Sequence, residues 1–254
     1  MTIKRSKKPV RVSLIIPVYN ETARLVSGLS LALSYLQKQR YSWELIIVDD
    51  GSRYPAAQVL EDAVKKKELR RMFAKPRVRI IQSDRNRGKG AAVGLGVAQS
   101  NGEVVVFSDV DFSVPIGELR VMVNELTRHQ MVIASRRLPQ SSIVIHQTPL
   151  RESAGRVFTV LSNILCGTRV ADITCGFKGF TRSAAQKIFG LRRINRWVFD
   201  AEIVFLARKH GISVGEIPVA WSNKTGSKVR FLDGAQSLVD LVRIRWNDLR
   251  GLYD

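Results

Sequence analysis

Short apolar runs rich in β-branched residues alternate with helical patterns along the first half of the chain. This alternation limits the possible folds more than any other feature of the sequence. The runs are Val12–Ile16, Leu45–Val48, Val78–Ile81, Val104–Ser108 and Met131–Ala134. Each is almost continuously apolar, as expected for strands that are covered on both faces. The pattern therefore predicts an α/β fold, with a mainly parallel sheet flanked by helices that form right-handed crossovers.

The sequence of 254 residues shows no repeat and no low-complexity linker, so a single domain is expected. We expect a mobile basic tail over residues 1–10 and the domain over residues 11–254. In the second half, the pattern predicts helices near 151–166 and 200–209. It also predicts a loop or short strand over 172–180 and a strand over 212–221.

The C-terminal segment, over about 232–250, has the pattern of an amphipathic helix. One face carries Leu238, Val242 and Trp246, and the opposite face carries Arg243 and Asn247. We expect the apolar face to pack on the core. A helix that lies on a membrane surface is the alternative, which the tryptophan and the arginines favour.

The chain is strongly basic, with 41 Lys and Arg against 22 Asp and Glu, a net charge of +19. Such an excess favours an anionic partner: nucleic acid, a phosphorylated substrate or an anionic membrane surface. A nucleic-acid-binding protein would cluster its basic residues among exposed aromatic residues. Here they are dispersed and aromatic residues make up only 7%, so we expect no nucleic acid partner. The sequence leaves the oligomeric state open.

Cys166 and Cys175 are too few for a disulfide framework. The first residues lack an apolar run of signal-peptide length and no apolar stretch is long enough to span a bilayer, so we expect neither a secretory leader nor a membrane span. We expect reduced thiols and a cytoplasmic protein that associates peripherally with the cytoplasmic face of the membrane. Because the histidines lack paired spacing, a zinc site is not expected.

Two carboxylates, Asp109 and Asp111, follow directly after an apolar strand. Side chains at i and i+2 project to the same side, and open α/β sheets bind ligands beyond the carboxyl ends of their strands. Two oxygen ligands at such a place suit Mg²⁺ or Mn²⁺ carrying phosphate oxygens. A solvated turn after the strand is the alternative for this pair taken alone.

Two other strand ends carry polar or aromatic groups. Asp50 follows one strand and can accept a hydrogen bond from a base or a ribose, although a helix cap or an Asp-Gly turn explains the same residues. Tyr19 follows another strand and offers a ring for stacking. Lys89 opens a helix, where a cation and the backbone N–H groups suit an anion. The glycine spacing around it fits neither a Walker A loop nor a dinucleotide-binding loop.

The combination of these motifs, in this order, resembles the inverting glycosyltransferases of family 2 with the GT-A fold. The motifs are Pro17-Val-Tyr-Asn-Glu21, Val48-Asp-Asp-Gly-Ser52, Asn86-Arg-Gly-Lys-Gly90 and Asp109-Val-Asp111. The likeness continues through Ser135-Arg136, Arg151, Asp172–Lys178, Phe199–Glu202, Glu216–Trp221 and Gly226–Lys228. The complete set is most similar to the dolichyl- and polyprenyl-phosphate β-glucosyltransferases.

The resemblance implies a role for each matching residue. The nucleoside pocket would comprise Pro17, Tyr19, Glu21, Val48 and Asp50. The metal and diphosphate site would comprise Asp109, Val110 and Asp111, with Asp109 and Asp111 as the metal ligands. Further donor contacts would come from Lys89, Ser113, Lys224 and Lys228. Arg136 and Arg151 would hold the acceptor phosphate, and together with the two aspartates they form the catalytic set.

The implied reaction is the inverting, Mg²⁺- or Mn²⁺-dependent transfer of a hexose from a nucleotide-sugar to a polyprenyl or dolichyl phosphate at the membrane surface. Glucose and UDP are favoured, because Ser113 and Ser222 depart from the residues that mannosyl enzymes often carry there. Mannose, an N-acetylhexosamine or a soluble saccharide acceptor are the alternatives. A hydroxyl acceptor would need a base, for which Asp200 and Glu202 are the candidates. A nucleotidyltransferase would instead release pyrophosphate.

Overall fold

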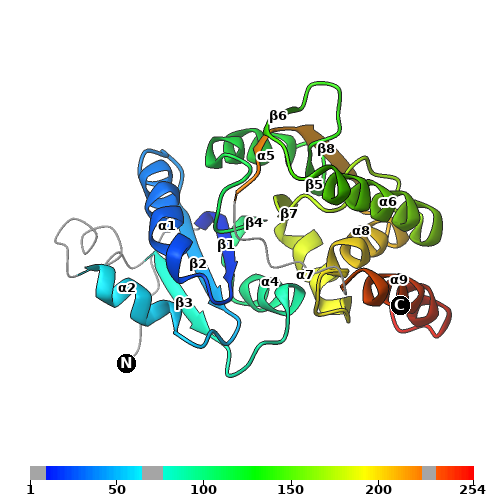
Figure 1. The fold of residues 1–254 in the computed structure, drawn as a ribbon, viewed down its shortest axis with the longest axis horizontal. Coiled ribbons are helices and arrows are strands. Elements are labelled where there is room, and N and C mark those ends of the chain that lie inside the picture. The colour runs from blue at the N-terminus through cyan, green and yellow to red at the C-terminus, as the bar shows by residue number, and fades with distance from the viewer. Residues whose placement is uncertain (1–9, 65–76, 225–232) are drawn as a thin grey trace.

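The computed structural model describes residues 10–64, 77–224 and 233–254. These residues form a seven-stranded sheet in the order β3-β2-β1-β4-β7-β5-β8 and a separate two-stranded sheet, β6-β9 (Figure 1). The strands of the large sheet are β1 (Val10–Val18), β2 (Trp43–Asp49), β3 (Val78–Gln82), β4 (Gly102–Phe107), β5 (Met131–Ser135), β7 (Lys178–Thr181) and β8 (Val214–Pro218). The small sheet pairs β6 (Ser142–Ile145) with β9 (Ala220–Ser222) in parallel.

Strands β1 to β4 are parallel, and β7 is antiparallel to both of its neighbours, β4 and β5. Successive side chains of β1 point to opposite faces of the sheet, and both faces are covered. Leu14 and Ile16 belong to one core cluster, and Ile15 belongs to the other. Because both faces are buried, the strands are apolar along their whole length, as the sequence predicts.

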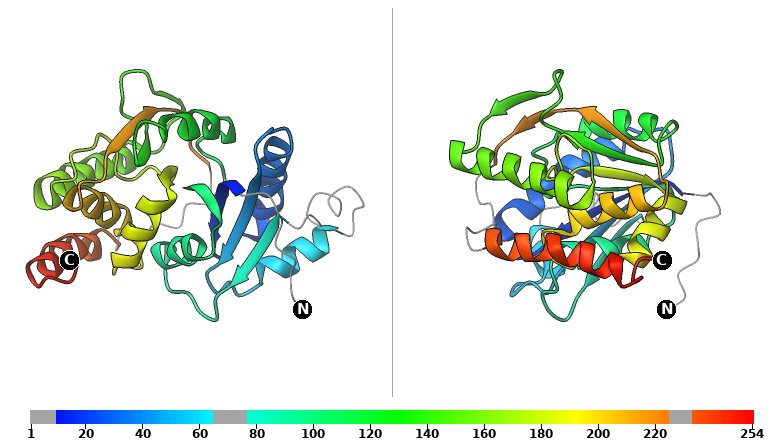
Figure 2. Two further views of the ribbon diagram at one scale, coloured as in Figure 1. Left: turned by 180° about the vertical axis from the view of Figure 1, so that it is seen from behind. Right: turned by 90° about the vertical axis from the view of Figure 1, so that its right-hand side faces the viewer.

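Helices cover both faces of the large sheet (Figures 1 and 2). The first core cluster is closed by α1 (Thr22–Leu36), α2 (Ala56–Val64) and α5 (Leu119–Glu125), which follows the 3₁₀ turn η1 (Ile116–Glu118). The second cluster is closed by α4 (Lys89–Ala98), α7 (Arg182–Leu191) and α8 (Phe199–Lys209), with α6 (Pro149–Cys166) and α9 (Asp233–Leu249) outside them.

Three segments differ from the sequence-based expectation. The single strand expected over 212–221 is two strands, β8 and β9, that belong to different sheets. The break follows Pro218, which has no N–H to continue the ladder. Helix α7 is not predicted from the sequence. Of the basic tail expected over residues 1–10, only Val10 lies within the described residues, where it begins β1.

The orientation of α9 corrects the expectation for its apolar face. The helix packs on the core through the fully buried Leu241 and Ile244, whereas the stripe assigned to the core points outward. The buried face tolerates polar residues because they are paired: the Asn247 side chain donates to the Tyr253 hydroxyl at 3.1 Å. Within residues 10–64, 77–224 and 233–254, no helix has the length and apolar character needed to cross a membrane.

Candidate active site

The carboxyl ends of β1, β2 and β4 meet at one edge of the sheet. Val18 lies beside Asp49, and the Ser108 N–H donates to the Ile15 carbonyl at 3.0 Å. The loops after β1 and β2 are tied together by Asn20, which has a φ of +49° and accepts a hydrogen bond from the Arg53 N–H at 2.8 Å. The segments 19–21, 50–52 and 109–111 therefore converge, as the sequence predicts.

Asp109 and Asp111 each face a cation at this edge. The Lys89 ammonium lies 2.7 Å from an Asp109 oxygen. Arg24, which the sequence analysis does not single out, lies 3.4 Å from Asp111 and 2.7 Å from Glu21. Asp111 also accepts the Ser113 N–H at 3.0 Å and so shapes its own turn. The site is a group of alternating acidic and basic side chains.

Lys89 is placed by the start of α4. Gly88 before it has a φ of +105°, and a Cβ there would lie 2.5 Å from the Asn195 carbonyl oxygen. Only glycine fits this approach without strain. Burial alone would lower the pKa of Lys89, but the Asp109 carboxylate, with help from Asp200, outweighs it and raises the pKa. Lys89 is therefore fully protonated at neutral pH and suited to an anion.

A second lysine lies below the site. Lys178 is fully buried, contacts Asp200 and donates to the carbonyls of Ile173 (3.1 Å) and Cys175 (2.7 Å). Burial raises the pKa of Asp200, against the opposing effect of Lys178 and Lys89. Of the two base candidates, Asp200 lies in this charged cluster. Glu202 instead accepts the N–H groups of Arg193 and Ile194 and the Tyr253 hydroxyl.

Asp49, the last residue of β2, and Asp50, which follows it, accept different hydrogen bonds. Asp49 accepts the Ser52 N–H at 2.9 Å and the Ala56 N–H at 2.7 Å, the capping role that the sequence leaves open. Asp50 accepts the N–H groups of Arg87 and Gly88 at 3.0 and 2.7 Å. Burial raises the pKa of Asp50. Asp50 thus fixes the loop that precedes Lys89. The contact between Asp50 and a nucleoside stays a prediction.

A pocket opens beside Asp109 and reaches Trp221 of β9. It is lined by Ser108, Asp109, Ser113, Val114, Gly176, Phe177 and Trp221. Gly176 lies directly against the carboxylate, since a Cβ at this residue would be 2.0 Å from an Asp109 oxygen. The segment between α6 and β7 therefore forms a wall of the site, which the order of motifs in the sequence does not reveal.

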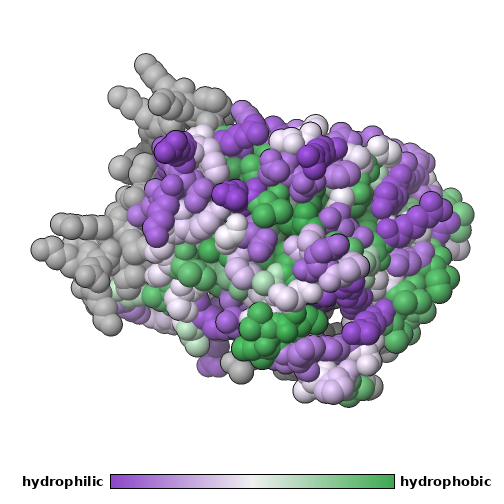
Figure 3. Space-filling model, turned by 90° about the horizontal axis from the view of Figure 1, so that it is seen from above, coloured by the Kyte–Doolittle hydropathy of each residue, from purple (hydrophilic) through white to green (hydrophobic). Residues whose placement is uncertain are grey.

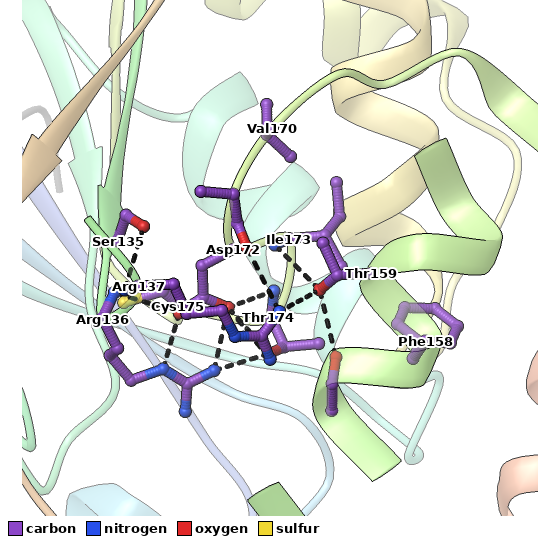
Figure 4. A network of polar contacts seen from close by, with 12 residues as sticks. Ser135, Arg136, Arg137, Phe158, Thr159, Val170, Asp172, Ile173, Thr174 and Cys175 are labelled. Carbon is purple, nitrogen blue, oxygen red and sulfur yellow. Dashed lines mark hydrogen bonds and ion pairs between the residues drawn. The ribbon is translucent and has the colours of Figure 1, made fainter. Parts of the chain in front are cut away.

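Arg136 is held by the same segment (Figure 4). Its Nε and Nη2 donate to the two oxygens of Asp172 at 2.6 and 2.9 Å, and Nη2 also donates to Thr174 at 2.6 Å. The guanidinium lies over the Trp221 ring, 5.3 Å from its centroid. Burial alone would raise the pKa of Asp172, but Arg136 outweighs it and lowers the pKa to about 2. Arg136 is thus oriented beside the pocket by a buried ion pair.

Arg137 secures the segment on its other side. Its Nη1 donates to the Thr159 hydroxyl at 2.7 Å and to the Ala171 carbonyl at 3.2 Å, which ties the segment to α6 (Figure 4). Burial lowers the pKa of Arg137, against the Asp172 carboxylate. Asp172 is completely buried, and a buried carboxylate needs a paired cation, which Arg136 supplies.

The other predicted residues lie at different depths. Val48 is fully buried in one core cluster and Val110 nearly so in the other, while Tyr19 is partly exposed after β1. Arg151 lies in the first turn of α6, and Lys224 ends the described stretch after β9. Pro17 pairs with Val48 in the sheet. Lys228 lies outside the described residues.

The chemistry of the two carboxylates fits a hard divalent cation. Among the residues that the structure describes, no group of three or more His, Cys, Asp or Glu side chains is arranged to hold a metal ion. Mg²⁺ typically takes one or two carboxylates and completes its shell with water and substrate phosphates. Asp109 and Asp111, with Asp109 about half exposed, meet that requirement, and the adjoining cations offset their charge when no ion is bound.

Residues 13–189, which include all of these site segments up to β7, match the model of glycosyl transferase family 2. The chain belongs to this family. This glycosyltransferase is 33% identical to the dolichyl-phosphate beta-glucosyltransferase of Dictyostelium discoideum, over 99% of its own chain and 80% of the relative. It is 33% identical to that of Homo sapiens, over 96% and 77% of the two chains. It is 31% identical to one of Trichomonas vaginalis, over 98% and 74%.

The fold of this glycosyltransferase is similar to that of glucosyl-3-phosphoglycerate synthase from Mycobacterium tuberculosis. The complex of that protein with UDP gives a TM-score of 0.66 at 15% identity, over 92% of this chain and 80% of the other. Its complex with Mn²⁺, UDP and glucosyl-3-phosphoglycerate gives 0.65 at 15% identity, over 96% and 85%. The likeness confirms the predicted GT-A fold.

Proposed function

We propose that this chain transfers glucose from UDP-glucose to a polyprenyl phosphate, with inversion at the anomeric carbon. The proposal rests on one observation. Asp109 and Asp111 lie with Lys89 and Arg24 at the edge of the sheet where the carboxyl ends of β1, β2 and β4 meet. The similarity to dolichyl-phosphate beta-glucosyltransferases over nearly the whole chain supports both the sugar and the lipid acceptor.

The donor diphosphate would lie between the carboxylates and the cations of the site. Asp109 and Asp111 would hold Mg²⁺ or Mn²⁺, which when bound neutralises the departing diphosphate. Lys89, fixed 2.7 Å from Asp109, would contribute a second positive charge on the protein side. The proposed nucleoside contacts are Pro17, Tyr19, Glu21, Val48 and Asp50. Further donor contacts are proposed for Val110, Ser113, Lys224 and Lys228.

The acceptor would be held by arginines. A phosphate monoester has a second pKa near 6, so its oxygen is largely anionic at pH 7 and needs no general base. It needs positioning and relief from repulsion by the donor. Among the described residues, the Nε and Nη2 of Arg136 are engaged by Asp172 and Thr174, which leaves Nη1 for a phosphate oxygen. Arg151, at the start of α6, would supply the second contact.

The bond changes follow from this placement. An acceptor phosphate oxygen forms a bond to the anomeric carbon while the bond from that carbon to the diphosphate oxygen breaks. UDP leaves with the electron pair. Because attack comes from the side opposite the leaving group, an α-linked donor gives a β-linked product. The lipid tail of the acceptor requires the reaction to take place at a membrane, which we propose to be its cytoplasmic face.

The direct test is transfer by the purified protein. We expect UDP-glucose, a short-chain polyprenyl phosphate in detergent and Mn²⁺ or Mg²⁺ to yield a glycolipid and equimolar UDP, and EDTA to stop the reaction. GDP-mannose, UDP-N-acetylglucosamine and a soluble saccharide acceptor serve as the comparison substrates. Transfer to the saccharide alone, or release of pyrophosphate, would overturn the proposal.

Arg151→Ala is expected to raise the KM for the polyprenyl phosphate by at least about tenfold and to leave the KM for UDP-glucose within about twofold, since a lost charge-assisted contact is worth roughly 1.5–3 kcal/mol. Initial rates with each substrate varied in turn measure both constants. Arg156→Ala, an exposed arginine on the same helix, is the matched control and should change neither constant with the short-chain acceptor in detergent, where no bilayer is present. Equal changes in both KM values would contradict an acceptor role.

Gly176→Ala is expected to lower kcat/KM for the donor by roughly 10- to 100-fold, because the new methyl group must displace the Asp109 carboxylate it would meet at 2.0 Å. The Mn²⁺ concentration that gives half-maximal rate should rise as well. Gly190→Ala is the matched control, because a Cβ at that glycine meets nothing within 4 Å. If both variants kept the wild-type rate, Gly176 would not position Asp109.

A further inference from the structure

Two helices expose apolar stripes on the same side of the molecule. On α6 the stripe consists of Leu150, Val157, Val160 and Ile164, and on α9 it consists of Leu238, Val239, Val242, Trp246 and Leu249. The exposed fraction of these side chains ranges from 45% for Leu238 to 76% for Leu249. Large apolar side chains that recur at helical spacing on a surface mark an interaction site. We call the two stripes together the α6/α9 face.

The two helices that carry the stripes adjoin each other. The Cys166 thiol at the end of α6 contacts the Leu241 carbonyl of α9 at 3.8 Å. Both helices run across the side of the molecule that faces the viewer in the right panel of Figure 2. In Figure 3, hydrophobic side chains gather at the right-hand edge, the side on which α6 lies in Figure 1. The two helices therefore lie on one side of the molecule, and each exposes its own apolar stripe there.

The charges beside the stripes are positive. Arg156, Arg243 and Arg250 are exposed next to the apolar residues. Of the carboxylates on the two helices whose side chains are described, Glu152 contacts His146, Asp248 pairs with Lys209, and Asp240 is buried and accepts a hydrogen bond from Gln236. An apolar face flanked by arginines without competing free carboxylates is the pattern of helices that lie in the interface of an anionic membrane.

We propose that the α6/α9 face docks onto the surface of an anionic lipid bilayer. The inference rests on the proposed function in one respect, since a lipid-linked acceptor needs an enzyme at the membrane. Arg151 begins α6 at one end of this face, so docking would bring the proposed acceptor contact next to the bilayer. The partner is the anionic bilayer itself, and the apolar stripes would lie among the acyl chains while the arginines contact headgroups.

The test is flotation of the purified protein with vesicles of phosphatidylcholine and phosphatidylglycerol, without donor or acceptor. We expect the wild type to bind, and to bind less to pure phosphatidylcholine. The double variant Val242→Glu, Trp246→Glu should bind at least about tenfold more weakly, because two apolar anchors are lost and two negative charges added. Val160→Glu, Ile164→Glu should behave in the same way on α6.

Leu31→Glu, Val121→Glu is the matched control, because these residues are exposed to 52% and 40% on helices that cover the other core cluster. It should bind like the wild type. Unchanged thermal unfolding of all variants separates lost docking from lost folding. Binding of the α6 and α9 variants that equals the wild type would overturn the proposal. So would a dimer in analytical ultracentrifugation that the Trp246 variant dissociates, with no vesicle binding by either form.

The vesicle-binding experiment and the sugar-transfer experiment test the two proposals separately. If the variants lose flotation but the wild type transfers no glucose in detergent, the proposed function falls and the docking face stands. If docking is correct together with the proposed function, the variants should keep the wild-type rate on the short-chain acceptor in detergent. They should lose most of their activity only on a long-chain acceptor in vesicles.

Discussion

Replacing Asp111 by alanine is expected to reduce glucose transfer by at least about 10³-fold, to the background of the assay. The substitution removes one of the two carboxylates proposed to hold the metal ion, and Arg24 keeps its ion pair with Glu21. Preorganised charge at the leaving group is commonly the largest single contribution to catalysis, worth several kcal/mol in comparable sites. Added Mn²⁺ should not restore the rate, because a ligand and not the ion is missing.

The control for Asp111 lies on the strand that precedes it, β4. Glu103, near the opposite end of β4, is likewise a carboxylate paired with an arginine, Arg11. Glu103→Ala should transfer glucose at the wild-type rate. Thermal unfolding should be unchanged in both variants within a few degrees, since both carboxylates lie near the surface. Turnover of Asp111→Ala close to that of the wild type, with metal present, would exclude Asp111 as a ligand.

Replacing Asp172 by alanine is expected to lower the free energy of unfolding by about 3–5 kcal/mol, because it leaves the Arg136 guanidinium without its buried partner. The Asp172 side chain is completely buried and accepts hydrogen bonds from Arg136 at 2.6 and 2.9 Å. Transfer should fall as well, since Arg136 would lose its orientation over Trp221. Denaturant unfolding measures the first effect, and the KM for the acceptor measures the second.

Glu125→Ala is the control for this prediction. Glu125 pairs with Arg128 at the surface, 3.3 Å apart, and exposed pairs contribute about 0–1 kcal/mol. A loss of stability in Asp172→Ala that does not exceed that of the control would show that the ion pair does not stabilise the segment between α6 and β7.

The same pair predicts a dependence of stability on pH. The pKa of Asp172 is lowered from an ordinary 3.8 to about 2 in the folded protein. The contribution of this group, roughly 2 kcal/mol, is therefore complete above about pH 4 and is lost as the pH falls towards 2. The wild type should lose stability more steeply than Asp172→Asn in this range. Parallel curves for the two proteins would contradict the assignment.

The sequence predicts the position of the site because topology alone determines it. Continuous apolar runs identify buried parallel strands, and the carboxyl ends of such strands meet at one edge. Residues 19–21, 50 and 109–111 follow these strands directly, so their convergence needs no knowledge of side-chain contacts. The motif order adds the family, which the comparisons confirm.

The sequence does not predict which side chain each charged residue of the site pairs with. Arg136 and Asp172 are 36 residues apart, and nothing in either local pattern indicates the other. Arg24 is one charged residue at the start of an apolar helix, yet it connects Glu21 to Asp111. Gly176 acts only through its closeness to Asp109. Such pairs depend on how loops from distant parts of the chain pack, which local periodicity does not contain.

Helix α9 shows what the sequence pattern alone cannot determine. Its periodicity determines that an apolar stripe and a polar face exist, and both are present. It cannot determine which face is buried, because a buried polar group costs little free energy once it is hydrogen-bonded. Tyr253 lies at the end of the chain and supplies that partner to Asn247. The tertiary structure therefore decided that the apolar stripe of α9 faces outward.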